Sequence, residues 1–225
     1  MAILFDFNGT MFFDEEFQRK SWMTFIEQKI NSPITDEEFK QFIHGRNADF
    51  TMEYFLKKSF ARDEIEALEE EKESIYRRLC LSSNEFKLAP GLVPFLNELK
   101  SRKIEMNIAT ASGWNNVEFF FNYLHLEEWF DIQKVVYNDG SCNGKPEPDM
   151  YLKAAENIGV TISECYIFED SKSGIEAAKR AKAKGVVKVL SVKENAEEID
   201  ADFEISTFDE IYTDSFLKNS LFSKI

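Results

Sequence analysis

The chain has few cysteines and no long apolar run. Its three cysteines, Cys80, Cys142 and Cys165, are too few and too scattered for a disulfide framework or a metal-binding knuckle, and their number is odd. A reducing compartment is the simplest interpretation. No apolar run approaches the roughly 20 residues of a membrane span, and the residues before Ile3 do not resemble a signal peptide. We therefore expect a soluble, cytoplasmic protein with no membrane partner.

Basic residues are also scarce. The sequence has 27 Lys and Arg against 41 Asp and Glu, which gives a formal net charge of −14. This excess of negative charge argues against a surface for nucleic acid or anionic lipid. A small molecule is the expected partner, and the chain is expected to be a monomer or a weak homodimer. Its 225 residues, 44% of them hydrophobic, are enough for one large domain or for a core domain with a smaller insert.

Short apolar runs alternate with helical patterns through most of the chain. Residues 3–5 are apolar without alternation, as in a central parallel strand that is covered on both faces. Further strands are predicted around 104–109, 132–137, 165–168 and 186–192, and helices around 91–102, 114–124, 147–158 and 173–182. This order predicts an α/β protein with a Rossmann-like parallel sheet and helices on both faces.

Residues 15–86 interrupt this alternation with helical patterns and no convincing strand. Thr35 to Glu38 has the pattern of a capping box, which predicts the start of a helix at this point. We therefore predict an α-helical cap at 15–86, inserted into a core that is formed by residues 1–14 and 87–225.

Polar residues suited to catalysis follow the predicted strands. Asp6 follows the first strand, Thr110 follows the strand at 104–109, and Glu169 and Asp170 follow the strand at 165–168. In an open parallel sheet, ligands bind at the carboxyl ends of the strands. Lys145 lies in the sequence GKPEPD, just before a proline-bounded turn. Three carboxylates, a hydroxyl and a lysine are therefore expected at one edge of the sheet.

This set of side chains suits phosphoryl transfer. Clustered carboxylates repel one another unless a cation lies among them, and oxygen ligands without His or Cys indicate Mg²⁺. Opposite the metal, Lys145 offers positive charge, Thr110 a hydroxyl, and the backbone N–H groups of Gly9 and Thr10 a cradle for phosphate. Asp6 can then attack phosphorus directly and form an aspartyl phosphate.

Four segments resemble, in order, the motifs of the haloacid dehalogenase superfamily of phosphohydrolases: DFNGT at 6–10, Thr110, GKPEPD at 144–149 and FED at 168–170. The likeness is to the phosphoglycolate phosphatase and beta-phosphoglucomutase branch, which also has a helical cap after the first motif, so it covers almost the whole chain. It implies catalytic roles for the residues at positions 6, 8 and 145. It also implies Mg²⁺ held by Asp6, Asp170 and the main-chain carbonyl of Asn8, and phosphate binding by Thr110, Ala111 and Lys145. We expect Glu169 to act through water or by contacting the metal's ligands; capping of the helix that starts near Ser173 is the alternative for Glu169 and Asp170.

Asn8 departs from the motif. Phosphatases and mutases of the superfamily usually have a second Asp here, which protonates the leaving oxygen and later deprotonates the attacking water. An amide can form hydrogen bonds but cannot transfer a proton, and general acid–base help is typically worth about 10²–10⁴ in rate. A phosphomutase is disfavoured because its cycle needs proton transfer in both directions. A dehalogenase is disfavoured because that branch works without metal, whereas Glu169, Asp170 and Lys145 fit the Mg²⁺ pattern.

Several accounts of Asn8 stay open. In the first account, the substrate has a leaving group that needs little protonation, such as that of an acyl phosphate. In the second, another acid, such as Asp14 or Glu15, replaces residue 8 in proton transfer. In the third, the protein mainly binds a phosphorylated ligand. Deamidation of the Asn-Gly pair is a fourth account. The preferred prediction is a Mg²⁺-dependent phosphatase of a small phosphorylated metabolite, with a catalytically impaired phospho-ligand-binding protein as the alternative.

Two further positions carry alternatives. In HGRN, residues 44–47, we expect Gly45 to break a helix and Arg46 to hold a second anionic group of the substrate, with Asn47 capping the next helix; ordinary loop residues are the other interpretation. Thr110 and Ser112 could simply cap the helix that starts near Trp114.

Overall fold

The computed structural model describes residues 1–44, 46–191 and 200–222. The chain divides into two compact units, a core unit of Met1–Phe13 with Lys87–Ile225 and a helical unit of Asp14–Phe86. Each unit is described by itself. Gly45, which was expected to break a helix, lies outside the described residues. Among the described residues, no helix combines the length and the apolar composition needed to cross a membrane.

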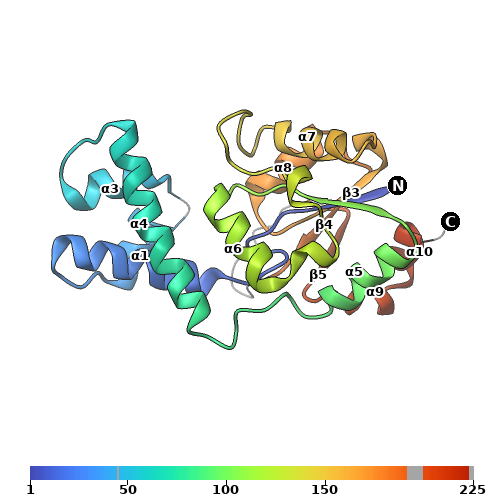
Figure 1. Ribbon diagram of the computed structural model, residues 1–225, viewed down its shortest axis with the longest axis horizontal. Coiled ribbons are helices and arrows are strands. Elements are labelled where there is room, and N and C mark those ends of the chain that lie inside the picture. Colours follow the sequence, from blue (N-terminus) through green and yellow to red (C-terminus); the bar gives the residue numbers. More distant parts are fainter. Residues whose placement is uncertain (45, 192–199, 223–225) are drawn as a thin grey trace. The chain divides into compact units, whose positions relative to one another are not determined.

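The core unit is built on one parallel sheet of five strands in the order β2-β1-β3-β4-β5 (Figure 1). The strands are β1 (Ala2–Phe5), β2 (Glu105–Ile108), β3 (Cys165–Glu169), β4 (Gly185–Val189) and β5 (Phe203–Ile205). β1 lies between β2 and β3, with Phe5 in register with Ile108 on one side and Phe168 on the other. The prediction of an α/β fold with a parallel sheet is confirmed, and the carboxyl ends of all five strands lie at one edge.

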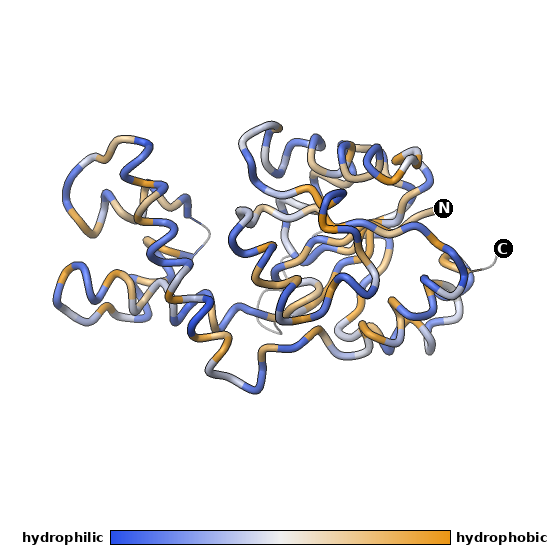
Figure 2. The backbone as a smooth tube through the Cα atoms, viewed as in Figure 1, coloured by the Kyte–Doolittle hydropathy of each residue, from blue (hydrophilic) through white to orange (hydrophobic). Residues whose placement is uncertain are grey.

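Helices cover both faces of this sheet. The core unit contains α5 (Leu92–Ser101), α6 (Trp114–Leu124), α7 (Asp149–Asn157), α8 (Lys172–Arg180), α9 (Glu210–Thr213) and α10 (Ser215–Phe222), with short 3-10 turns η1 (Leu126–Glu128), η2 (Ile132–Lys134) and η3 (Ile162–Glu164). Figure 1 shows α7 and α8 on one face and α5, α9 and α10 on the other. Figure 2 shows apolar residues concentrated along the strands between these layers. The strands are therefore apolar on both sides, which explains the runs without alternation.

Alternate side chains along β1 point to opposite faces of the sheet and fill the two halves of the core. Leu4 packs with Tyr151 and Ile175 on the α7 and α8 side. Phe5 stacks on Phe168 with ring centroids 5.3 Å apart, within a larger group of phenylalanines on the other side. Much of the high phenylalanine content thus serves to hold helices against the sheet.

The prediction of a strand at 132–137 is wrong. Residues 132–134 form the 3-10 turn η2, and only an isolated bridge pairs Ala109 with Val136. The segment still runs beside β2, because Thr110 N–H donates to Val136 O at 2.9 Å and Val136 N–H donates to Ile108 O at 3.0 Å. The strand β5 was not predicted, since three residues are too short a run to give a pattern.

The helical unit contains α1 (Glu15–Ile30), α2 (Asp36–Phe42), α3 (Ala48–Leu56) and α4 (Arg62–Leu81). The predicted capping box is confirmed: Thr35 Oγ1 accepts from Glu38 N–H at 3.2 Å, and the Glu38 carboxylate accepts from Thr35 N–H at 2.8 Å. Asn47 is the N-cap residue of α3, so its predicted position is confirmed, but its side chain accepts no capping hydrogen bond.

A buried polar group lies between α1 and α4 in this unit. Asp14 accepts from the Tyr76 hydroxyl at 2.7 Å and from Gln18 Nε2 at 3.0 Å. Lys72, only 2% exposed, donates to Gln18 Oε1 and to Glu73 and lies against the rings of Trp22 and Tyr76. These bonds tie the start of α1 to the middle of α4, and they give Asp14 a structural role within its own unit.

Candidate active site

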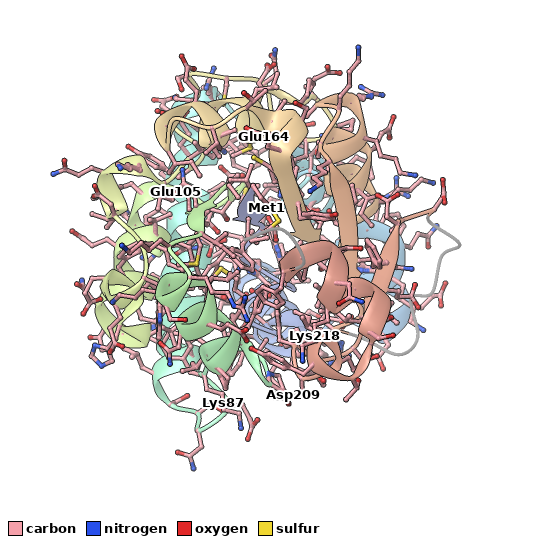
Figure 3. All side chains as sticks on the ribbon, turned by 90° about the vertical axis from the view of Figure 1, so that its right-hand side faces the viewer. Met1, Lys87, Glu105, Glu164, Asp209 and Lys218 are labelled. Atoms are coloured by element: carbon pink, nitrogen blue, oxygen red, sulfur yellow. The ribbon has the colours of Figure 1, made fainter. Side chains whose placement is uncertain are left out.

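The functional candidates of the core unit gather at the carboxyl edge of the sheet. Figure 3 looks onto the opposite edge, where Met1, Glu105 and Glu164 mark the amino ends of β1, β2 and β3. Asp6 directly follows β1, Glu169 is the last residue of the neighbouring β3, and Asp170 directly follows β3. Parallel pairing therefore brings the predicted carboxylates together although about 160 residues separate them in sequence.

Lys145 joins two of these carboxylates. Its Nζ donates to Asp6 Oδ1 at 2.5 Å and to Glu169 Oε1 at 2.6 Å. The lysine side chain is 7% exposed, and those of Asp6 and Glu169 are 9% and 1% exposed. Burial alone would lower the pKa of Lys145, but the charges of Asp6 and Glu169 outweigh it and hold that pKa above its usual value. The lysine is thus a fixed cation beside the candidate nucleophile.

The pKa of Asp6 shows how crowded the negative charge is. Burial raises the pKa of Asp6 to about 7; the Lys145 ammonium opposes this rise, and the charge of Glu169 adds to it. One lysine therefore does not fully compensate the carboxylates gathered here. A further cation would favour the ionised form of Asp6, which is the form that can attack phosphorus.

Glu169 is held from three sides. Besides Lys145, its Oε1 accepts from the Tyr151 hydroxyl at 3.2 Å, and its Oε2 accepts from Ser171 N–H at 2.6 Å. A Cβ on Gly174 would stand 1.6 Å from Glu169 Oε1, so this close packing requires glycine in α8. Glu169 does not cap α8, because the N-cap is Ser171, whose Oγ accepts from Gly174 N–H at 3.1 Å. Its contacts suit a residue that positions Lys145.

Asp170 is held by the turn after β1. Thr10, fully buried, donates through its hydroxyl to Asp170 Oδ1 at 3.4 Å. Gly9 has φ +77°, and a Cβ there would lie 2.0 Å from Asp170 Oδ2. The N–H groups of Gly9 and Thr10 donate to Phe12 O and Phe7 O within the turn. These N–H groups are therefore not a phosphate cradle in this conformation, and the prediction is corrected: both residues make room for Asp170 and hold it.

The three carboxylates fit a divalent cation. Asp6, Glu169 and Asp170 each offer an oxygen within 4.8 Å of the others, and the described residues contain no other group of three His, Cys, Asp or Glu side chains so arranged. All the donors are oxygens, which favours Mg²⁺ over zinc or copper. Both oxygens of Glu169 already accept hydrogen bonds, from Lys145 Nζ and from Ser171 N–H. The oxygens of Asp6 and Asp170 are therefore better suited to bind the cation directly.

Thr110 and Ser112 link the end of β2 to residue 8. Thr110 Oγ1 accepts from Ser112 N–H at 3.2 Å, and the Ser112 hydroxyl donates to Asn8 Oδ1 at 2.8 Å. The N-cap of α6 is Gly113, which has no capping side chain, so the alternative that Thr110 or Ser112 caps this helix is excluded. Ala111 lies between them and is exposed.

Arg46 belongs to the helical unit. It is exposed, its Nε donates to Gln41 O at 3.2 Å, and its guanidinium lies 5.5 Å from the ring centroid of Phe50. Its contact with a substrate anion stays a prediction. Asp14, one of the acids considered as a substitute for residue 8, is 3% exposed and carries the bonds to Gln18 and Tyr76 described above.

Tyr151, Gly174 and Ser171 were not found by sequence reasoning. Tyr151 and Gly174 lie on the inner faces of α7 and α8, and helical packing alone brings them to Glu169. A serine or glycine near a helix start has no signal that separates this role from ordinary capping.

A parallel sheet with a lysine-bridged pair of carboxylates at its carboxyl edge fits a hydrolase of phosphoric monoesters, and several relatives of the chain carry the name of a phosphatase. The chain matches the family model of the haloacid dehalogenase-like hydrolases over residues 1–182 and belongs to that family.

Three relatives place the chain within this family. It is 28% identical over 194 residues to "Phosphorylated carbohydrates phosphatase" of Thermotoga maritima, covering 85% of this chain and 84% of the relative. It is 26% identical over 185 residues to "Beta-phosphoglucomutase" of Bacillus subtilis, covering 80% of this chain and 79% of the relative. Among solved structures, a HAD hydrolase of family IA, variant 3, from Entamoeba histolytica is 37% identical, with a TM-score of 0.88 over 96% of this chain and 97% of that one. The predicted resemblance to this superfamily is confirmed.

Proposed function

We propose that the protein is a Mg²⁺-dependent phosphatase of a small phosphorylated carbohydrate, with Asp6 as the nucleophile. The observation that carries this proposal is the contact of Lys145 Nζ with both Asp6 and Glu169, at the sheet edge where Asp170 also lies. The carbohydrate is inferred from the name of the Thermotoga maritima relative.

The chemistry follows from the positions of these groups. An oxygen of Asp6 forms a bond to phosphorus while the bond from phosphorus to the leaving oxygen breaks, which gives an aspartyl phosphate that water then hydrolyses. Lys145 offsets the repulsion between the Asp6 carboxylate and the anionic phosphate, and Thr110 and Ala111 bind phosphate oxygens. Mg²⁺ held by Asp6, Asp170 and the main-chain carbonyl of Asn8, with Glu169 acting through water, would supply further positive charge at the phosphate.

The helical unit has a proposed role as the cap of this site. Covering the phosphate would exclude water during phosphoryl transfer. Arg46, exposed and charged, would bind a second anionic group of the substrate and so contribute to specificity.

A second candidate function rests on Asn8. With an amide at this position, the same groups would bind a phosphorylated ligand and Mg²⁺ without useful turnover. The binder would gain thermal stability from Mg²⁺ and ligand together, because a ligand that binds only the folded state stabilises it, and it would release no phosphate.

Phosphate release separates these two functions. We would assay a panel of sugar phosphates, aryl phosphates and acetyl phosphate with Mg²⁺ and with a chelator, using Asp6→Asn as the blank and Glu118→Gln, an exposed change on α6, as the matched control. The phosphatase predicts release that the chelator abolishes and that Asp6→Asn lowers by about 10³-fold or more. Thermal stabilisation by the ligand without phosphate release would favour the binding protein. Phosphate release that survives chelation would contradict the proposed dependence on Mg²⁺.

A further inference from the structure

The hydrogen bond from Ser112 to Asn8 limits what residue 8 can do. The Ser112 hydroxyl donates to Asn8 Oδ1 at 2.8 Å, so the amide oxygen is the acceptor and the amide nitrogen carries only donor hydrogens. An amide N–H and a serine hydroxyl both keep their protons at neutral pH. The pair can therefore stabilise a developing negative charge by hydrogen bonding, but neither member can give a proton to a departing oxygen.

The neighbouring groups of the core unit are committed to other partners. Lys145 donates to Asp6 and Glu169, and Tyr151 donates to Glu169. Thr10 donates to Asp170. Asp6 is itself the proposed nucleophile. Each of these donors therefore directs its proton to a carboxylate and not to the leaving oxygen.

We propose, on the basis of the function proposed above, that this site selects phosphates whose leaving oxygen departs as a stable anion. For a carbohydrate, such a phosphate is carried on the anomeric carbon, because the ring oxygen makes the departing oxygen less basic than that of a primary alcohol. An acyl phosphate shares the same chemistry. Ser112 acts as a positioning residue that fixes the orientation of the Asn8 amide.

The two steps balance without an enzymic acid or base. In the first, an Asp6 oxygen bonds to phosphorus, the bond from phosphorus to the leaving oxygen breaks, and its electron pair stays on that oxygen, which takes a proton from solvent afterwards. In the second, a water oxygen bonds to phosphorus and the bond to Asp6 breaks. The carboxylate is regenerated, and both protons of the water leave with the released phosphate.

The test is the dependence of single-turnover rate on the pKa of the leaving group. We would use a series of aryl phosphates of rising phenol pKa, together with acetyl phosphate, an anomeric sugar phosphate and a primary sugar phosphate. The wild type and Asn8→Asp are compared, with Asp6→Asn as the blank. We expect a steep fall in wild-type rate as the leaving group becomes more basic. In Asn8→Asp we expect a shallow dependence, with a gain of about 10²-fold or more on the primary sugar phosphate and little change on acetyl phosphate.

Ser112 is tested in the same assay. Ser112→Ala should lower the rate several-fold for every leaving group and leave the slope unchanged, Ser112→Thr should restore it, and Ser101→Ala, an exposed serine on α5, is the matched control. A steeper slope in Ser112→Ala would identify Ser112 as a proton donor and overturn the proposal.

The outcomes separate this inference from the function on which it rests. A wild type that cleaves primary and anomeric sugar phosphates equally well, with a shallow slope, overturns the leaving-group inference and leaves the phosphatase standing. No release above the Asp6→Asn blank from any substrate overturns the phosphatase, and the inference fails with it.

Discussion

Gly9 and Asp170 approach so closely that a Cβ on Gly9 would stand 2.0 Å from Asp170 Oδ2. The contact joins the turn after β1 to the end of β3, so the position of Asp170 depends on the small size of residue 9, far away in the sequence. Gly9 also has φ +77°, where an L side chain is strained. A substitution at Gly9 would therefore both strain the backbone and displace Asp170, and a matched substitution at a second glycine with positive φ separates the two effects.

Gly9→Ala should therefore abolish phosphate release, because the new methyl group displaces Asp170 from its position beside Asp6. Gly140→Ala is the matched control: Gly140 has φ +73°, and nothing lies within 4 Å of a Cβ there. Both variants should lose about 1–2 kcal/mol of stability from the left-handed backbone, measured by urea denaturation. Full activity in Gly9→Ala would show that Asp170 does not need its present position.

Asp170→Asn should remove the stabilisation by Mg²⁺. The wild type is expected to melt at a higher temperature with Mg²⁺ than with chelator, because an ion that binds only the folded state stabilises it. Replacing one carboxylate of the cluster by an amide weakens the site for a hard cation. Asp139→Asn, a change at an exposed loop residue, should keep the Mg²⁺-induced shift. Equal shifts in the two variants would place the metal elsewhere.

Lys145→Met should destabilise the core unit as well as stop catalysis. It would leave Asp6 and Glu169 buried side by side without their shared cation, and removing one partner of a buried ion pair typically costs about 3–5 kcal/mol. Lys153→Met removes a lysine of α7 whose side chain is 39% exposed, and it should change stability by about 0.5 kcal/mol or less. Chemical denaturation of both variants measures the difference. A Lys145→Met protein as stable as the wild type would mean that the carboxylates are compensated in another way.

Tyr76→Phe tests the polar group of the helical unit. Its hydroxyl donates to Asp14 at 2.7 Å, and both residues are buried. Taking a hydrogen-bond donor from a buried carboxylate should cost about 1–3 kcal/mol. The control is Tyr123→Phe, because Tyr123 is 53% exposed. A loss no greater than that of the control, in urea denaturation, would show that Asp14 is satisfied without Tyr76.

The sequence predicted most of the sheet because its strands are buried on both faces. The unbroken apolar runs at β1 and β3 could be recognised without knowledge of their partners. The segment at 132–137 also contains an apolar run, at 135–137, yet only Val136 pairs, since the 3-10 turn at 132–134 takes up the preceding residues. Composition does not separate a strand from an extended segment that makes a single bridge.

The part of the candidate site that lies at the ends of the strands was predictable from the sequence. Asp6, Glu169 and Asp170 come together because parallel strands end at one edge, and a sequence shows where strands end. The roles of Gly9 and Thr10 were not predictable in detail, because the turn's own hydrogen bonds take up their N–H groups. The bond from Ser112 to Asn8 depends on the path of the loop after β2, which no local pattern specifies.

The central claim is that Asp6 is the nucleophile at a phosphoryl-transfer site, and trapping the intermediate tests it most directly. Wild-type protein with Mg²⁺ and acetyl phosphate would be quenched in acid and digested, and the phosphorylated peptide identified by mass spectrometry. The account predicts phosphate on the Asp6 side chain in the wild type, none in Asp6→Asn, and a larger steady-state fraction in the wild type than in Asn8→Asp, because Asn8 cannot activate water. Phosphate release without any label on Asp6, or with the same label in Asp6→Asn, would contradict it.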